Sequence, residues 1–450
     1  MNERYSLTKG HIGKVLLRFA LPFLLSSFLQ ALYGAVDLFV VGQYADSAAV
    51  SAVSIGSQVM QTITGIILGI SMGGTVLIGR CVGERNEKGA AKAVGTLTVL
   101  FIILAAVLTP VMLLCTNGSV AIMETPPEAV AYTRTYILIC ACGIPFIVGY
   151  NAVSGIFRGI GDSKTPVYFI AIACAINIAG DFLLTGLLHM GAAGAAIATI
   201  SAQGISFLIS LLYLYKKGLA FPFSKKDLRL DGFSLRAILK VGIPIALQDA
   251  LVNVSFLVIT AIINVMGLVA SAAVGVVEKI IIFAMLPPNS FASAVATATA
   301  QNAGAGREDR ALASLRWGIG FSLVFGIAVC VYSQFGAQTL ASIFTNDDAV
   351  IKAAGEYLRY YSIDCILVSF VFCMNSYFSG EGRAIVSFVH SMIATFGVRI
   401  PMTYLLSRTA NGSLLSMGLA APAASAVSIL ICFGYLIWMY YRRKHTANAA

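Results

Sequence analysis

The stretch from Lys14 to Tyr44 is an apolar run of helical length that contains one proline, Pro22, and one carboxylate, Asp37. About 20 apolar residues are enough to cross a bilayer as a helix, so this run is predicted to span a membrane. An acid near the middle of such a helix costs roughly 2.5–3.5 kcal/mol on insertion scales, and a cost of that size usually marks an ion or proton pathway. The alternatives for Asp37 are capping by hydroxyl groups or snorkelling to the surface, although its side chain is short. Because proline interrupts the backbone hydrogen bonds, the helix is predicted to bend at Pro22.

The composition extends this interpretation to the whole chain. Of its 450 residues, 58% are hydrophobic and 11% are charged, and the mean hydropathy is +0.86, values that exclude a water-soluble globule. The chain is therefore predicted to be an all-α integral membrane protein with twelve transmembrane helices. The predicted spans are 14–43, 51–79, 93–114, 131–152, 166–187, 192–215, 237–265, 270–299, 314–334, 356–378, 384–406 and 415–441.

The Lys and Arg residues lie mostly in alternate loops. Of the 30 basic residues, 24 fall in every second loop and in the two terminal segments, beginning with Arg4. Because positive loops remain in the cytoplasm, both termini are predicted to be cytoplasmic, in a bacterial plasma membrane. The net charge of +10 is spread over these loops, so membrane lipids and not nucleic acid are the expected partners. The basic residues elsewhere are Arg134, Lys279, Lys352, Arg359, Arg399 and Arg408.

The two halves of the chain resemble each other on either side of the polar stretch from Lys216 to Leu235. Six spans in each half give repeats of the same orientation, related by an axis along the membrane normal. The alternative to a repeat is that glycine-rich cytoplasmic turns resemble each other by chance. The second and third of the matching pairs share an offset of 221 residues. The pairs are LRFALPF (17–23) with LKVGIPI (239–245), GERNEKGAAKA (83–93) with GAGREDRALAS (304–314), and FRGIG (157–161) with FSGEG (378–382).

These repeats predict two pseudo-symmetric lobes. The N-lobe covers residues 1–215, a cytoplasmic linker covers 216–236, and the C-lobe covers 237–450. Pro22 and Pro244 occupy like positions in the two halves, so both are predicted to be hinges.

Polar side chains occur at similar depth in three spans of the N-terminal half. Asn177 and Asp181 are four residues apart and so share one helical face. At 1.5 Å per residue, Asp181 lies about 22 Å above the cytoplasmic end of its span, and Thr199 lies about 12 Å below the outer end of the next. Asp37 is also in the outer part of its span. Two carboxylates, an amide and a hydroxyl suit a desolvated Na⁺. A pair of carboxylates can equally bind a proton. The alternative to an ion site is two buried acids that are unrelated to each other.

The C-terminal half has a different set of polar residues. Asp364 follows Tyr360 by four residues near the outer end of the tenth span. The alternative to a second ion site is that Lys279 neutralises one of these acids. Arg399 is expected to snorkel or to pair with an acid. The candidates for a second ion site are Tyr360, Asp364, Glu278 and Asp249.

Several motifs together point to one family. They are LPF ahead of Asp37, the paired glycine-rich loops that begin at 83 and 304, FRGIGDSKTP at 157–166, N-x-x-x-D at 177–181, and GAAGAAIAT ending at Thr199. In these features the chain resembles the MATE (multidrug and toxic compound extrusion) family over essentially its whole length. The resemblance implies two six-helix lobes around a central cleft. It also implies antiport of an organic substrate against Na⁺ or H⁺ by alternating access, with no further cofactor.

The resemblance also assigns site residues. In the DinF-like prokaryotic branch, the residues that match Asp37, Asn177, Asp181 and Thr199 form the cation site, and the one that matches Pro22 bends the first span. In the NorM-like branch, a C-lobe site uses an acid on the seventh span and a Tyr-x-x-x-Asp on the tenth. Tyr360 and Asp364 match the latter motif. The seventh span has Asn253 and Ser255 near the place of the acid, with Asp249 about a turn earlier.

The chain is thus predicted not to be an enzyme. It is predicted to be a monomeric, cation-coupled antiporter that exports cationic or amphipathic organic compounds. The alternative within transport is a flippase-like exporter of a lipid-linked or other amphiphilic metabolite, which would be expected to have a basic cavity. A membrane-embedded prenyl transferase would need an acidic metal motif, and Asn346-Asp347-Asp348 is a lone polar turn. The nine cysteines, of which Cys140 and Cys142 are the closest pair, are expected to be free thiols.

The predicted topology can be checked by thiol labelling of intact cells. In a background without native cysteines, Asp347→Cys is expected to react with an impermeant thiol reagent, because its loop is predicted to lie outside. Ser224→Cys, in the cytoplasmic linker, is the control and is expected to remain unlabelled. The opposite pattern would overturn the orientation.

Overall fold

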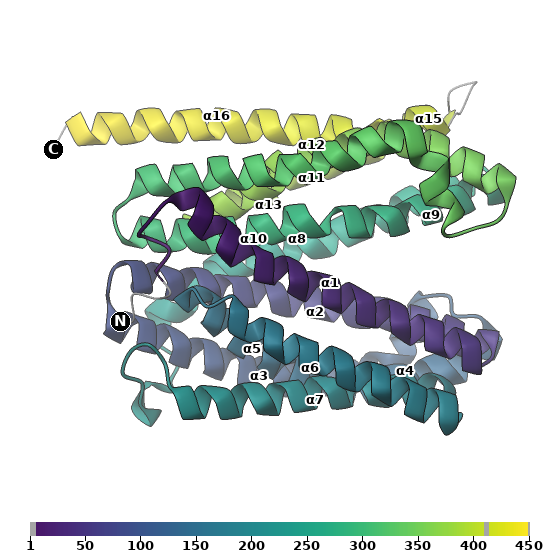
Figure 1. Ribbon diagram of the computed structural model, residues 1–450, viewed down its shortest axis with the longest axis horizontal. Coiled ribbons are helices and arrows are strands. Elements are labelled where there is room, and N and C mark those ends of the chain that lie inside the picture. The colour runs from purple at the N-terminus through teal and green to yellow at the C-terminus, as the bar shows by residue number, and fades with distance from the viewer. Residues whose placement is uncertain (1–5, 409–413, 449–450) are drawn as a thin grey trace. The chain divides into compact units, whose positions relative to one another are not determined.

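The computed structural model describes residues 6–408 and 414–448, with side chains up to Arg442. Within these ranges the regular secondary structure is helical throughout and contains no strand (Figure 1). The all-α fold class is therefore confirmed. Of the basic residues behind the topology prediction, Arg4 and the side chains of Arg443 and Lys444 lie outside this description.

The helices follow one another with short connections. Before the linker the elements are α1 Ile12–Tyr44, α2 Ser47–Gly83, α3 Glu87–Ile122, η2 Pro127–Ala129, α4 Val130–Cys142, α5 Ile144–Ile160, α6 Lys164–Asp181, η3 Phe182–Leu187 and α7 Gly191–Lys217. After η4 Lys225–Asp227 they are α8 Gly232–Asn264, α9 Leu268–Ala284, α10 Leu286–Gly304, α11 Glu308–Ser342, α12 Asp348–Gly380, α13 Ala384–Ala394, η5 Thr395–Arg399, α14 Ile400–Arg408, α15 Leu414–Met417 and α16 Ala420–Asn448. The short elements η3 and η5 are π-helical.

The helices pack as two compact units. Unit 1 comprises Met1–Ala246 together with Ala300–Arg310, and unit 2 comprises Leu247–Thr299 together with Ala311–Ala450. The first part of α8 and the end of α10 therefore pack with the N-terminal helices. The two predicted lobes are defined by their sets of spans, on either side of the linker 216–236, so they do not coincide with these units. The lobe boundaries remain a prediction.

In the described part of the chain, ten helices are long and apolar enough to cross a membrane, and the number reaches twelve when each of two bent pairs counts as one span. The spans predicted at 131–152 and 270–299 are both broken. The helix bends by 47° between α4 and α5 and by 41° between α9 and α10. Both α5 and α10 begin with a proline in the first turn, and a proline cannot donate the hydrogen bond that would continue the preceding helix.

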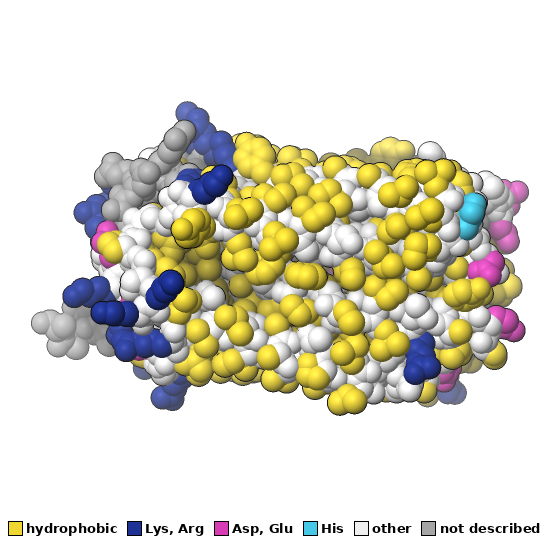
Figure 2. All heavy atoms as spheres, turned by 90° about the horizontal axis from the view of Figure 1, so that it is seen from below, with side chains coloured by type: hydrophobic (Ala, Val, Ile, Leu, Met, Phe, Trp, Pro, Cys, Tyr) yellow, Lys and Arg dark blue, Asp and Glu magenta, His cyan; other side chains and the backbone are white. Residues whose placement is uncertain are grey.

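Hydrophobic side chains cover the middle of the face drawn in Figure 2, whereas Lys and Arg gather at one end of it and Asp and Glu at the other. Large apolar side chains are widely exposed, among them Leu114 and Ile122 in unit 1 and Val265 and Phe335 in unit 2. Exposure on this scale is typical of a surface that contacts lipid rather than water.

Small residues let α2 and α5 pack closely inside unit 1. The Ser71 hydroxyl donates to the carbonyl oxygen of Asn151 at 2.9 Å, and the Thr75 hydroxyl donates to that of Gly155 at 3.0 Å. A Cβ at Gly155 would come within 2.5 Å of the Ser71 hydroxyl. Lipid removes the hydrophobic drive between helices, so close packing and hydrogen bonds of this kind hold them together.

Two glycines meet the opposite backbone where α2 and α10 end. Gly83 lies against the carbonyl oxygen of Gln301, and Gly304 lies against that of Arg80, and a Cβ at either glycine would overlap the oxygen. Only glycine permits so close an approach. Arg80 and Gln301 are 221 residues apart, as are Gly83 and Gly304, which is the offset between the repeated loops. The two contacts of this glycine crossing are therefore equivalent, one from each repeat.

The segment before α1 is attached to the glycine crossing. Leu7 donates its backbone N–H to Oε1 of Gln301 at 3.0 Å, and Nε2 of Gln301 donates to the carbonyl oxygen of Gly159 at 3.1 Å. Gln301 thus joins the N-terminal segment, α5 and α10. Further bonds go to backbone oxygens of this segment, from Asn302 Nδ2 to Leu7 at 3.4 Å, from the Arg307 guanidinium group to Thr8 at 2.9 Å and from that of Arg310 to Gly10 at 3.0 Å.

A methyl group added at the glycine crossing is expected to lower stability. In Gly83→Ala it overlaps the Gln301 carbonyl oxygen, so α2 and α10 must separate, at a cost of about 1–3 kcal/mol. Gly65→Ala is the matched control, because Gly65 lies in the same helix with nothing within 4 Å of its Cβ position. The midpoint of thermal unfolding of the purified protein should fall for Gly83→Ala and not for Gly65→Ala. Equal midpoints would contradict the close contact.

Candidate cation site

Four polar residues of unit 1 converge from three helices. Asp37 comes from α1, Asn177 and Asp181 come from α6, and Thr199 comes from α7. Asp37, Asn177 and Asp181 are 5%, 1% and 0% exposed, and Thr199 is half-buried. The structure therefore brings together the residues from which the sequence predicts a cation site.

Hydrogen bonds connect three of these side chains. Asn177 Nδ2 donates to Thr199 Oγ1 at 3.4 Å, and Thr199 Oγ1 donates to Asp37 Oδ2 at 3.3 Å. The Asp37 carboxyl group also interacts directly with that of Asp181. The two acids are thus neighbours, an arrangement that favours one shared site over two unrelated buried acids.

Several oxygens of this site have no hydrogen-bond donor among the described residues. They are Asp37 Oδ1, Asn177 Oδ1 and both carboxylate oxygens of Asp181. Buried polar atoms are nearly always paired, and a buried carboxylate needs a proton or an opposite charge. Oxygen ligands suit a hard cation such as Na⁺, and a proton shared by Asp37 and Asp181 would relieve the same repulsion.

Small residues and a π-helical turn bring α6 and α7 together at this depth. A Cβ at Gly180 would come within 2.9 Å of the Ala198 side chain, so the glycine allows the two helices to approach. The π-helical turn η3 begins directly after Asp181, and such turns are frequent at functional sites. Within it, Thr185 donates to the carbonyl oxygen of Gly191 at 3.2 Å, at the start of α7. These contacts set the register in which α6 faces α7.

Two further polar residues surround the site. Tyr33 lies one turn before Asp37 on α1, and its hydroxyl group interacts with the side chain of Gln203, one turn after Thr199 on α7. Tyr33 also lies close enough to Asp37 to interact with its charge. Neither residue is among those predicted, although the spacing of four residues from a predicted site residue is a usable signal.

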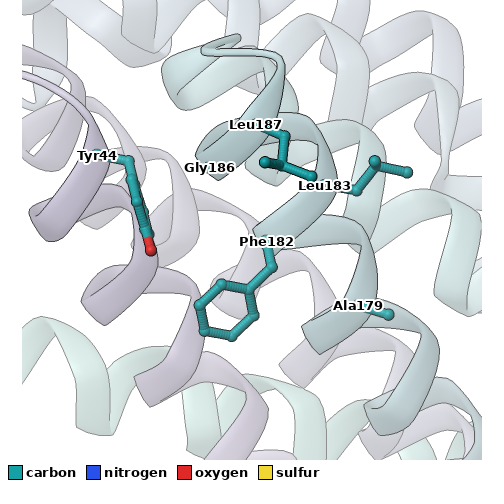
Figure 3. Close-up of a pocket in the computed structure, with 6 residues that line it drawn as sticks. All are labelled: Tyr44, Ala179, Phe182, Leu183, Gly186 and Leu187. Atoms are coloured by element: carbon teal, nitrogen blue, oxygen red, sulfur yellow. The ribbon is translucent and has the colours of Figure 1, made fainter.

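An apolar pocket lies beside η3 (Figure 3). It has a volume of about 370 Å³, and the rings of Tyr44 and Phe182 meet edge to face beside it, with 6.4 Å between centroids. None of its lining side chains is charged, so it suits a lipid chain or another apolar group rather than the ion. The lining residues are Tyr44, Ala179, Phe182, Leu183, Gly186 and Leu187.

The predicted hinges lie inside long helices. Pro22 is within α1 and Pro244 is within α8, and each helix continues on both sides of its proline. The missing N–H leaves the carbonyl oxygen four residues earlier, that of Arg18 or Lys240, without its helical partner. Each helix is therefore easier to bend at its proline than elsewhere.

The predicted C-lobe residues do not gather in the same way. Asp364 of α12 is buried, and its Oδ1 has no hydrogen-bond partner among the described residues. Glu278 of α9 and Tyr360 of α12 are half-buried, whereas Asp249 of α8 is exposed. Arg399, which is not among the predicted site residues, interacts electrostatically with both Asp364 and Glu278.

Comparisons with known proteins agree with these features. The MatE family model matches residues 22–183 and again 244–405, so the two halves are related repeats. The probable multidrug resistance proteins YoeA and YpnP of Bacillus subtilis (strain 168) are each 28% identical to 98% of this chain, over 96% and 98% of their own lengths.

A solved structure has the same fold. It is described as the outward-facing conformation of a multidrug resistance MATE family transporter of the MOP superfamily. It matches 100% of this chain and 99% of its own chain with a TM-score of 0.92 and 21% identity. With its repeated helices and two matches to one family model, the chain belongs to the MatE family, as its motifs predict.

Proposed function

We propose that the chain is a cation-coupled antiporter that exports organic, cationic or amphipathic compounds by alternating access, as a monomer in the plasma membrane. The observation that carries this proposal is the group of buried oxygens around Asp37 and Asp181 that have no donor among the residues the structure describes. Membership of the MatE family and the multidrug names of the relatives support the substrate class. The names of YoeA and YpnP refer to multidrug resistance and not to the flippase-like alternative.

The energy that one ion supplies limits what can be exported. At about 100 mV, inside negative, one inward charge releases about 2.3 kcal/mol, and a tenfold gradient adds about 1.4 kcal/mol. The sum of roughly 3.7 kcal/mol allows several-hundred-fold export of a neutral substrate. A monovalent organic cation exchanged for one ion moves no net charge, so only the chemical gradient of about 1.4 kcal/mol remains. Strong export of a cation therefore needs two ions in each cycle.

The composition of the site is compatible with either coupling ion. Asn177 and Thr199 contribute neutral oxygens that suit Na⁺, and the pair Asp37–Asp181 suits a proton. The concentration of Lys and Arg at one end of the face in Figure 2 supports cytoplasmic termini by the positive-inside rule. The match of the four site residues to the DinF-like branch supports ion binding in the N-terminal half.

Replacing either acid of the site is expected to abolish coupling. Asp37→Asn and Asp181→Asn each remove the charge that binds the ion, so gradient-driven transport should fall at least about tenfold. Purified protein in liposomes, driven by a Na⁺ gradient and by a pH gradient in separate experiments, measures the effect and identifies the ion. Asp347→Asn, at an exposed helix N-cap, is the control and should transport at the wild-type rate. Full transport by both site variants would move the coupling site elsewhere, with Asp364 as the next candidate.

If Pro22 is a hinge, replacing it should slow transport without changing the stability of the protein. Pro22→Ala restores the backbone donor and stiffens α1, so the variant should insert and unfold like the wild type but transport slowly. Pro110→Ala is the matched control, because Pro110 is also inside a long helix of unit 1 but has no assigned role. Transport and thermal unfolding are measured on the same preparations. Wild-type rates in Pro22→Ala would show that the proline is only a tolerated kink.

A further inference from the structure

Arg399 carries a positive charge within the membrane-spanning part of unit 2. It is the last residue of the π-helical turn η5, in the candidate span Ala384–Arg408. A charged side chain in such a span is costly and almost always paired, so its surroundings indicate a role. The π-helical turn that presents it is a second feature common at functional sites.

Aromatic side chains hold the guanidinium group of Arg399. Its Nη2 donates to the hydroxyl oxygen of Tyr361 at 3.2 Å, and its Cζ lies 4.3 Å from the ring centroid of Phe256, which is a cation–π distance. Tyr361 in turn packs against Tyr357, with 5.7 Å between ring centroids. A hydroxyl acceptor and an aromatic face together match the shape and charge of a guanidinium group.

Two acids lie in the field of this group. Asp364 follows Tyr361, the hydrogen-bond partner of Arg399, by three residues on α12 and so lies on the same face of that helix. Asp364 and Glu278 both interact electrostatically with Arg399. Asp364 is 5% exposed, and its Oδ1 has no hydrogen-bond partner among the described residues. Lys279, the alternative neutralising residue, has an exposed side chain. Among the described residues, Arg399 is thus the basic group that interacts with both Asp364 and Glu278.

The two units thus differ in where their positive charge comes from. In unit 1, Asp37 and Asp181 lie together, and no basic residue of the described chain is among the interactions of either carboxyl group. We propose that Arg399 is a tethered cation, which gives Asp364 and Glu278 the charge that the coupling ion gives the acids of unit 1. Unit 2 then takes up no coupling ion. This inference rests on the proposed function, because it confines ion coupling to unit 1.

Chemical rescue tests the tethered cation. Purified Arg399→Ala is titrated with millimolar ethylguanidinium, which fits the place that the Arg399 side chain vacates beside Phe256 and Tyr361. Its midpoint of thermal unfolding is expected to rise by more than about 2 °C, as for any ligand that binds only the folded state. The wild type, whose own guanidinium group fills the site, is expected not to respond. Arg399→Ala combined with Asp364→Asn is the matched control and is also expected not to respond.

Each outcome of this titration shows whether Arg399 acts as a counter-charge for the acids or only fills space. An equal rise in the wild type and Arg399→Ala, or a rise that persists with Asp364→Asn, would overturn the tethered cation. If Arg399→Ala does not fold, recovery of folding by the added Asp364→Asn supports the counter-charge, and continued failure overturns it. Thermal unfolding needs no ion gradient. If the proposed antiport is wrong, the liposome experiment will show it, and the results of the thermal-unfolding experiment will not change.

Discussion

An ionised side chain in hydrocarbon needs an opposite charge, and this requirement organises the polar interior of both units. In unit 1, Asp37 and Asp181 approach each other from α1 and α6, and several of their oxygens have no donor in the described part of the chain. In unit 2, Asp364 lies in the field of Arg399. On the two proposals made above, units built from related repeats solve the same electrostatic problem in different ways, with an exchangeable charge in one and a fixed charge in the other.

The scaffold that holds these charges relies on small residues. Hydrogen bonds from Ser71 and Thr75 fix α2 on α5, and Gly180 lets α6 approach α7 beside the site. At the glycine crossing, backbone meets backbone twice, at Gly83 and at Gly304. A scaffold this tightly packed transmits a change at one end as a movement of whole helices, because close-packed interiors do not deform continuously.

Hydropathy and helical spacing predicted most of the fold and the centre of the site, because both signals are local. Run lengths predicted the spans, and the i,i+4 spacing placed Asn177 beside Asp181. The breaks before α5 and α10 are interruptions within apolar runs that hydropathy does not resolve, although their prolines indicate them. The setting of Arg399 depends on a π-helical turn and on Phe256 of another helix. Sequence periodicity contains no information on that register between helices.

The attachment of Leu7 to Gln301 has a consequence for how the protein is made. The two residues are separated by 294 positions in the chain. At about 5–20 residues per second, Gln301 leaves the ribosome about 15–60 s after Leu7. Throughout that interval the first span is in the bilayer while the backbone N–H of Leu7 lacks Gln301 as its acceptor. Leu7 is captured only when the end of α10 emerges, so this contact forms after the first two spans of the second repeat have been synthesised.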